Sequence, residues 1–166
     1  MLLALLQARP TPTNLRLRSD ESDYVSDEPS SYSSAQVPFT PCKGHSFGEV
    51  SSMEISPCER NLSSDPCTFR HGVNYTISLG FVSHRNSSLP RSSVVAQDGT
   101  QSYAYSGQSF NACRYSHCPI VAEQASTYVY QFHTLRSSFN YLTFNVSDNF
   151  EGPSLFCAGT AVRFEL

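Results

Sequence analysis

Six cysteines constrain the fold of this chain more strongly than any other feature. In order they are Cys42, Cys58, Cys67, Cys113, Cys118 and Cys157. The second and third are close in sequence, as are the fourth and fifth, and strand-like sequence separates the groups. An even number of cysteines in a chain of 166 residues is typical of a disulfide framework. The framework in turn predicts an oxidising compartment, outside the cell or within the secretory pathway.

The connectivity of the cysteines stays open at the level of sequence, because six cysteines allow many pairings. If the close neighbours pair locally, Cys42 is left with Cys157. That disulfide would tie the first strand to the last. It would close a loop of more than about a hundred residues, which the chain-entropy model values at about 4–5 kcal/mol.

A metal site is the alternative at Cys113 and Cys118, because His117 lies between them and could supply a third ligand. Zinc sites usually combine two such clusters at defined spacing. The sequence shows no second Cys/His cluster. We therefore favour a disulfide here and predict neither a metal site nor a cofactor.

The length suffices for one domain, and the apolar content for one sizeable core. Hydrophobic residues make up 39% of the chain, with 11 Phe, 9 Tyr and no Trp. The formal net charge is -3, and Lys43 is the single lysine. Because no basic stripe is present, we expect neither a nucleic-acid partner nor a polybasic membrane anchor.

Residues 1–35 differ in character from the rest of the chain. Met1 to Leu6 is apolar, but it is shorter than the ~7–15 residues of a signal-peptide core and has no basic flank. It predicts a weak or truncated signal. Residues 19–34 are rich in Ser, Asp and Glu, which predicts a disordered acidic extension. We expect one domain over residues 36–166, and no stretch approaches the ~20 apolar residues of a membrane span.

Alternation of apolar and polar residues is the dominant pattern within this domain. In residues 74–82, one face carries Tyr75, Ile77, Leu79 and Phe81. The other segments with this alternation are residues 37–42, 49–56, 92–97, 100–105, 126–134, 139–147 and 155–164. No segment shows a sustained helical period. The pattern predicts an all-β, two-sheet sandwich of immunoglobulin-like architecture.

Turns and sequons support this assignment. Asp98-Gly99 lies between two short candidate strands and predicts a tight hairpin turn. Asn-x-Ser/Thr sequons occur at Asn61, Asn74, Asn86 and Asn145. The second and fourth fall on the polar faces of their predicted strands, and the other two fall in loops. All could carry a glycan without disturbing the core, so we predict glycosylation at each.

Catalytic patterns are weak in this chain. Its histidines are His45, His71, His84, His117 and His133. Serine is abundant, so a Ser-His-Asp set can always be imagined, but the sequence contains no nucleophile-elbow pattern. We predict solvated or structural histidines and no enzymatic activity.

The many aromatic residues of the predicted strands allow two interpretations. In the first they fill an ordinary core. In the second the two sheets stand apart, and the aromatic side chains line a pocket of about 300–1,000 Å³, as in lipid binders. Spacing alone does not separate a filled core from a hollow one.

The order and spacing of the cysteines, with the residues around them, resemble a known family. The matching strings are Ser56-Pro57-Cys58, Pro66-Cys67, the run from Asn111 to Ile120, and the run from Ser154 to Cys157. On these strings the chain resembles the ML (lipid-recognition) domain. That family includes the Niemann-Pick type C2 sterol-transfer proteins and the group 2 mite allergens. The resemblance covers about residues 37–166.

The resemblance implies an immunoglobulin-like sandwich that holds one lipid in a pocket between its sheets. It implies three disulfides, which join Cys42 to Cys157, Cys58 to Cys67, and Cys113 to Cys118. It places Tyr105, Leu135 and Phe139 at the border of the pocket. It makes one strand a pocket wall through Tyr75, Ile77, Leu79 and Phe81.

The resemblance also implies a function. It predicts a monomeric, secreted or lysosomal protein that binds one sterol or other hydrophobic lipid and hands it to a membrane or to a membrane acceptor protein. The alternative is a module for bacterial lipids or fatty ligands in innate immunity or chemical sensing. Arg91, Arg114 and Arg136 could form a basic rim for anionic head groups, and residues 105–110 are more polar than in the sterol-transfer members. A structural sandwich with a filled core is a third interpretation.

Overall fold

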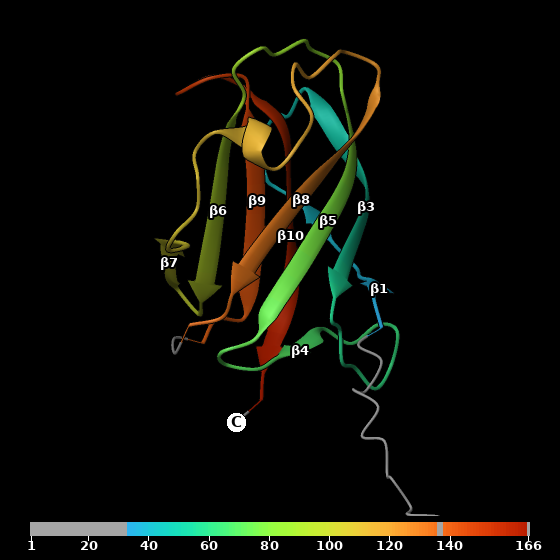
Figure 1. Ribbon diagram of the computed structural model, residues 1–166, viewed down its shortest axis with the longest axis vertical. Helices are drawn as coiled ribbons and strands as arrows, with labels where there is room; N and C mark the ends of the chain where they lie inside the picture. The colour runs from blue at the N-terminus through green and yellow to red at the C-terminus, as the bar shows by residue number, and fades with distance from the viewer. Residues whose placement is uncertain (1–32, 136–137, 166) are drawn as a thin grey trace, which may run out of the picture.

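Two β-sheets pack face to face in the computed structural model, which describes residues 33–135 and 138–165 (Figure 1). The front sheet in Figure 1 has the strand order β1-β3-β5-β8. Its strands are β1 (Ala35–Gln36), β3 (Gly48–Ser56), β5 (Asn74–Ser83) and β8 (Ala125–His133). The predicted all-β, two-sheet sandwich is confirmed.

The second sheet lies behind the first and has the order β2-β10-β9-β6-β7, with β4 added beside β10. Its strands are β2 (Thr40–Pro41), β4 (Cys67–Phe69), β6 (Arg91–Asp98), β7 (Gln101–Ala104), β9 (Tyr141–Ser147) and β10 (Ser154–Phe164). A short 3-10 helix, η1 (Ala112–Arg114), precedes β8. Among the described residues, no helix is long and apolar enough to cross a membrane.

The alternation read from the sequence sets which side chains face the interior. Every second residue of β5, from Tyr75 to Phe81, is buried between the sheets. The neighbouring strand β8 buries Tyr128, Tyr130 and Phe132 in the same way. On the opposite sheet, β9 contributes the buried side chains Leu142, Phe144 and Val146. Because side chains alternate along a strand, the polar residues between these positions face outward.

The single strand predicted over residues 37–42 is wrong. The chain pairs with β3 through β1, and then crosses to pair with β10 through β2. Pro38 lies at the crossing, and it cannot continue a ladder because it has no N–H to donate. The carbonyl of Pro38 instead accepts a hydrogen bond from the Thr160 hydroxyl at 2.8 Å. The N-terminal segment thus bridges the two sheets along one edge of the sandwich.

The sequence pattern predicted neither β4 nor η1. β4 is three residues long and runs parallel to the end of β10, from which Val162 pairs with Cys67. η1 is held at its start by Asn111, whose side-chain oxygen accepts a hydrogen bond from the Cys113 N–H at 3.0 Å. Both elements are too short for an apolar period to show.

Three disulfides staple the sandwich and its loops. They join Cys42 to Cys157, Cys58 to Cys67, and Cys113 to Cys118, which is the pairing that the resemblance implies. The first links β10 to the end of the bridging segment. The third closes the loop that contains η1, so its two cysteines are not metal ligands here. Every cysteine of the chain is thereby paired.

The β6–β7 hairpin turns where the Asp98-Gly99 signal predicts it. Asp98 pairs with Gln101 across a two-residue loop of Gly99 and Thr100. Gly99 has a φ of 57°, in the left-handed region that a residue without Cβ enters most easily. This hairpin ends the second sheet at the same side of the sandwich as β8, so that side is the open edge of both sheets (Figure 1).

Candidate functional site

An aromatic cluster fills the space between the sheets near β4. The Phe69 ring stacks on Tyr75 with 4.1 Å between centroids. The Tyr105 ring meets Phe132 edge-on at 5.2 Å and Phe139 at 5.7 Å. All of these residues are buried. This part of the interior is therefore walled by flat, apolar side chains from both sheets and from the loop after β7.

Of the three border residues named from the sequence, two lie in this cluster and one lies outside it. Tyr105 and Phe139 are buried in it, and the Tyr105 hydroxyl donates to the His133 carbonyl at 3.0 Å. Leu135 is exposed, and its carbonyl oxygen lies 2.6 Å from Nδ1 of His71. Leu135 thus lies outside the packed cluster, on the loop that joins β8 to β9. The assignment of these residues to a ligand stays a prediction.

The proposed wall strand, β5, runs the full length of the interior (Figure 1). Tyr75 belongs to the aromatic cluster, whereas Ile77 and Leu79 are fully buried further along the strand. At its far end the Phe81 ring packs against Phe156 of β10 at 4.4 Å. The four side chains form one continuous apolar row. Their contact with a lipid is likewise a prediction.

Tyrosines bring hydroxyl groups into this apolar interior. The Tyr128 hydroxyl is hydrogen-bonded to the buried Ser92 hydroxyl at 2.7 Å. Burial raises the pKa of Tyr128 and of Tyr130 well above the ordinary value, because an ionised phenolate would lose its hydration there. Burial also raises the pKa of Tyr105. These phenols stay protonated and act as neutral hydrogen-bonding groups.

The segment of residues 105–116, which we call the covering segment, leaves β7, first runs beside β6 and covers this edge of the sandwich. The side-chain amide of Gln108 pairs with β6 as the backbone of a neighbouring strand would. It accepts a hydrogen bond from the Val94 N–H at 2.7 Å and donates one to the Val94 carbonyl at 2.8 Å. The Gln108 amide also donates to the Tyr105 carbonyl at 2.9 Å. One side chain thus replaces a peptide unit in the ladder. It lets the chain bend away from the sheet and open a space toward β8.

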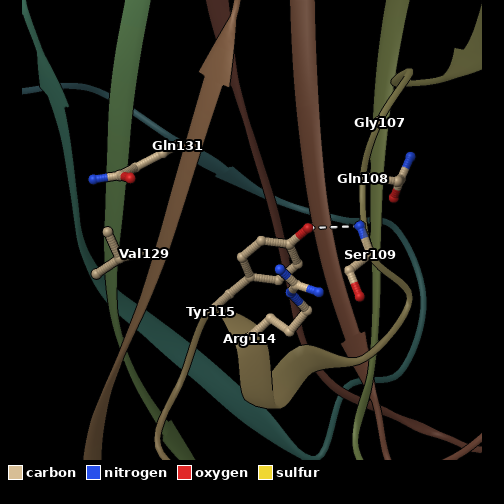
Figure 2. A pocket seen from close by; sticks show the side chains of 7 residues that line it. All are labelled: Gly107, Gln108, Ser109, Arg114, Tyr115, Val129 and Gln131. Atoms are coloured by element: carbon tan, nitrogen blue, oxygen red, sulfur yellow. Dashed lines mark hydrogen bonds between the residues drawn. The ribbon is translucent and has the colours of Figure 1, made fainter.

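A groove of about 650 Å³ lies between this segment and β8 (Figure 2). Val129 and Gln131 of β8 border one side, and Gln108, Ser109 and Arg114 border the other. The arrangement gives the groove a largely polar lining with one cationic side chain. Among the ion pairs of the described residues, none involves Arg114.

Tyr115 separates the groove from the interior. In Figure 2 its ring extends from the η1 segment toward Ser109, whose N–H donates to the Tyr115 hydroxyl at 2.6 Å. Behind the groove the same ring contacts Tyr128 at 5.3 Å and Tyr130 at 5.2 Å. One tyrosine therefore touches the polar groove with its hydroxyl and the aromatic interior with its ring.

Sequence reasoning missed Gln108 and Tyr115. Gln108 carries no local signal, since its role depends on Val94 in another strand. Tyr115 lies in the cysteine loop, and that location was the only available hint of a fixed position. Of the basic residues suggested for a rim, Arg114 lies at the groove and Arg91 is the first residue of β6, whereas Arg136 is outside the described residues.

The described residues contain no group of three or more His, Cys, Asp or Glu side chains that could hold a metal ion. The histidines have separate partners. Nδ1 of His84 lies 2.8 Å from Glu123, Nδ1 of His133 lies 2.8 Å from Asn74, and His71 stacks on Phe164. These pairings are spread over the surface. Nε2 of His71 also lies 3.5 Å from the Ser138 hydroxyl, while its Nδ1 lies beside the Leu135 carbonyl and not beside a carboxylate.

The sequon asparagines occupy accessible positions. Asn61, Asn74 and Asn86 are exposed, and Asn145 is half-buried on the outward face of β9. The Asn145 side-chain oxygen accepts a hydrogen bond from the Ser154 hydroxyl at 2.7 Å. None of the four side chains points into the packed interior, and glycosylation at these positions stays a prediction.

The buried tyrosines give a testable dependence of stability on pH. Unfolded Tyr128 loses its proton near pH 10.0, whereas the folded protein retains it to higher pH. Stability is therefore complete below that pH and falls as the pH rises further, by about 1.4 kcal/mol per pH unit for one such group. Rapid urea unfolding at several alkaline pH values measures the slope. The slope should be shallower for Tyr128→Phe, and an unchanged slope would contradict the assignment.

Comparisons with known proteins agree with this architecture. The family model for the ML domain matches residues 36–164. Comparison with curated proteins finds no match. Among solved structures, the fold is similar to that of a Niemann-Pick type C2 protein from the Japanese carpenter ant, with a TM-score of 0.65. The two are 14% identical, over 77% of this chain and 99% of that one. Because the family model covers most of the sequence, the chain belongs to the ML domain family.

Proposed function

We propose that this protein binds one sterol between its two sheets and carries it to a membrane or to an acceptor protein. Membership of the ML domain family supports lipid binding. The observation that carries the proposal is the continuous apolar row of β5, which begins in the aromatic cluster, together with the polar groove along the other side of the neighbouring strand β8. A sterol has the same division into a long apolar body and one polar end.

The interior must open for this function, because its rings are now in contact. The open edge is where the sheets separate most readily. There β8 is joined to the covering segment by the Val129 N–H, which donates to the Tyr115 carbonyl at 2.7 Å, and by the Tyr105 hydroxyl. Removal of the lipid's apolar surface from water would supply about 25 cal/mol per Å² to offset the rearrangement.

Tyrosine hydroxyls at this edge suit an uncharged head group. Those of Tyr105 and Tyr115 lie where the interior meets the edge, and each already makes a hydrogen bond. A sterol hydroxyl placed beside them could bond to protein or water, and so avoid the ~1–3 kcal/mol cost of a buried unpaired group. No charge is needed for such a head group.

The same features suit a carrier that works as a monomer outside the cell or in the lysosomal lumen. Three disulfides persist in oxidising compartments and are rare in the cytosol. The disulfide between Cys113 and Cys118 would also hold the loop that contains η1 in place while the edge opens. A monomer leaves that edge accessible to a membrane or an acceptor.

One observation favours a second candidate function. Arg114 borders the groove and makes no ion pair with another described residue. A guanidinium is well suited to phosphate or carboxylate groups. The alternative is therefore the recognition of an anionic bacterial lipid or a fatty acid, in innate immunity or chemical sensing.

Binding of a fluorescent sterol to the disulfide-intact protein tests the proposal. We expect saturable binding that unlabelled sterol displaces and fatty acid does not. Displacement by fatty acid as well would replace the sterol proposal with a broader lipid specificity. Displacement by an anionic lipid alone, lost in Arg114→Gln, would favour the second candidate. Absence of sterol binding by a folded protein would overturn the sterol proposal, and absence of fatty-acid binding as well would favour a filled structural core.

Phe139→Trp should weaken sterol binding by about tenfold, which is about 1.4 kcal/mol. The larger ring would take up space between Tyr105 and Phe164, both of which contact Phe139 now. The dissociation constant from fluorescence titration gives the effect. Leu62→Trp is the matched control, because Leu62 is exposed and outside the interior. Equal sterol affinities of the two variants would show that Phe139 does not border the bound sterol.

A further inference from the structure

Three large apolar side chains are exposed on connections between strands that reach the end of the sandwich uppermost in Figure 1. They are Leu89, Phe110 and Phe150, which are 77%, 52% and 74% exposed. Each comes from a different connection between strands. Arg91 lies close to the Phe110 and Phe150 rings, and Leu89 precedes it by two residues in the chain. We name these four residues the loop patch.

Hydrogen bonds hold these three connections to one another. The Ser87 hydroxyl donates to the Asp148 carbonyl at 2.9 Å, which ties the Leu89 loop to the connection that carries Phe150. The Ala112 N–H donates to the Pro90 carbonyl at 3.1 Å, which ties the same loop to the segment that carries Phe110. The loop patch is therefore a fixed arrangement of side chains, not a chance neighbourhood of flexible loop tips.

Arg91 places a positive charge inside the loop patch. Its guanidinium carbon lies 5.6 Å from the centre of the Phe110 ring and 5.5 Å from that of Phe150. None of the ion pairs among the described residues involves Arg91. A hollow of about 280 Å³ beside it is also bordered by Glu151. Other charges on these connections are Arg85, Arg114, Asp148 and Glu123, and the last of these is paired with His84.

We propose that the loop patch docks this protein on the surface of a phospholipid bilayer. Exposed aromatic and aliphatic side chains can enter the boundary between head groups and acyl chains, where their apolar surface leaves water. Arg91 can keep its stem against the two rings and extend its charge to lipid phosphates, which complement it. Within the described chain, no other segment covers the exposed apolar side chains of the loop patch, and no acidic side chain forms an ion pair with Arg91.

The loop patch is continuous with the candidate groove. Phe110 follows Ser109 directly, and both Ser109 and Arg114 border the groove. Docking through Phe110 would therefore bring one end of the groove to the bilayer. Docking needs no lipid in the interior, so this proposal can fail or succeed separately from the proposed function.

Flotation with vesicles tests the proposal on the full, disulfide-intact chain. Glycans are removed first, because Asn86 lies in the same loop as Leu89. We expect the protein to float with vesicles of equal parts phosphatidylcholine and phosphatidylserine. Leu89→Ala with Phe150→Ala should lower the partition coefficient by at least about tenfold, whereas the control Leu62→Ala, at a 64% exposed site elsewhere, should leave it unchanged. No flotation of the wild type, or equal losses in both variants, would overturn the proposal.

A fluorescence measurement gives a second, independent test. The chain contains no Trp, so Phe150→Trp introduces a single reporter. Its emission should shift to the blue and be quenched by brominated phosphatidylcholine when these vesicles are added. Leu62→Trp should show neither change. Arg91→Gln should weaken binding to the anionic vesicles by about fivefold, with little change on pure phosphatidylcholine. An unshifted Phe150→Trp spectrum in the presence of saturating vesicles would contradict docking through the loop patch.

Discussion

Replacing Cys42 and Cys157 together with serine is expected to lower the free energy of unfolding by about 4–5 kcal/mol. This disulfide joins residues 115 positions apart, so it restricts the unfolded chain more than either of the others. It also anchors the segment that pairs with β10 through Thr40 and Pro41. Urea unfolding under oxidising conditions measures the loss, and a loss of this size would leave a domain of ordinary stability barely folded.

The matched control is the replacement of Cys113 and Cys118 with serine. These residues are only 5 positions apart, and the same chain-entropy model assigns their disulfide about 2 kcal/mol. The two double variants should therefore differ by more than a factor of two in their effect. Similar losses would mean that local strain or loop packing determines how much each disulfide stabilises the fold, and that loop length does not.

Strands with a regular alternation and a two-sided environment could be predicted from the sequence. β5 is the clearest case, since Tyr75 to Phe81 alternate with polar residues and the strand has a hydrogen-bonded neighbour on both sides. β9 follows the same rule. β8 also alternates, although it lies at the edge of its sheet, whereas β10 alternates less regularly because it buries Leu155 and Gly159 as well. In each, one face is buried by the other sheet, so the physical environment has the period that the sequence shows.

Elements that depend on distant parts of the chain could not be predicted. Residues 37–42 look like one strand, but their partners belong to different sheets, and only the tertiary structure decides where the chain crosses. β4 is short and parallel to β10, so it has no hairpin signal. The groove depends on Gln108 bonding Val94, a contact between a loop and a strand that no local pattern encodes.

In the candidate site, too, the features with a local sequence pattern could be predicted and those set by distant contacts could not. The buried apolar row of β5 follows from alternation, and the cysteines and their flanking strings pointed to the family. The exposure of Leu135 and the position of Tyr115 between groove and interior did not follow, because both are set by loop conformation. Loops take their shape from side-chain and disulfide contacts, which vary with every residue involved.

The second large effect is expected for Phe69→Ala. Phe69 is fully buried, and its ring contacts Tyr75, Phe132, Phe139 and Phe164 with centroid separations of 4.1 to 6.2 Å. Loss of the ring removes the centre of the aromatic cluster and leaves a cavity, which should cost about 3–5 kcal/mol of stability. Chemical unfolding without added lipid measures this cost.

Lipid should restore part of that loss if the interior is the binding site. In the wild type a ligand must displace packed rings, whereas in Phe69→Ala it finds vacated apolar space. We therefore expect sterol to stabilise the variant by about 1 kcal/mol more than it stabilises the wild type, equivalent to several-fold tighter binding. Ile120→Ala is the matched control, because Ile120 is buried near the loop patch, where its backbone pairs with Ser87. Sterol should stabilise that variant no more than the wild type. Equal stabilisation of both variants would show that the ligand does not lie against Phe69, and the site would then have to be sought in the groove beside Tyr115.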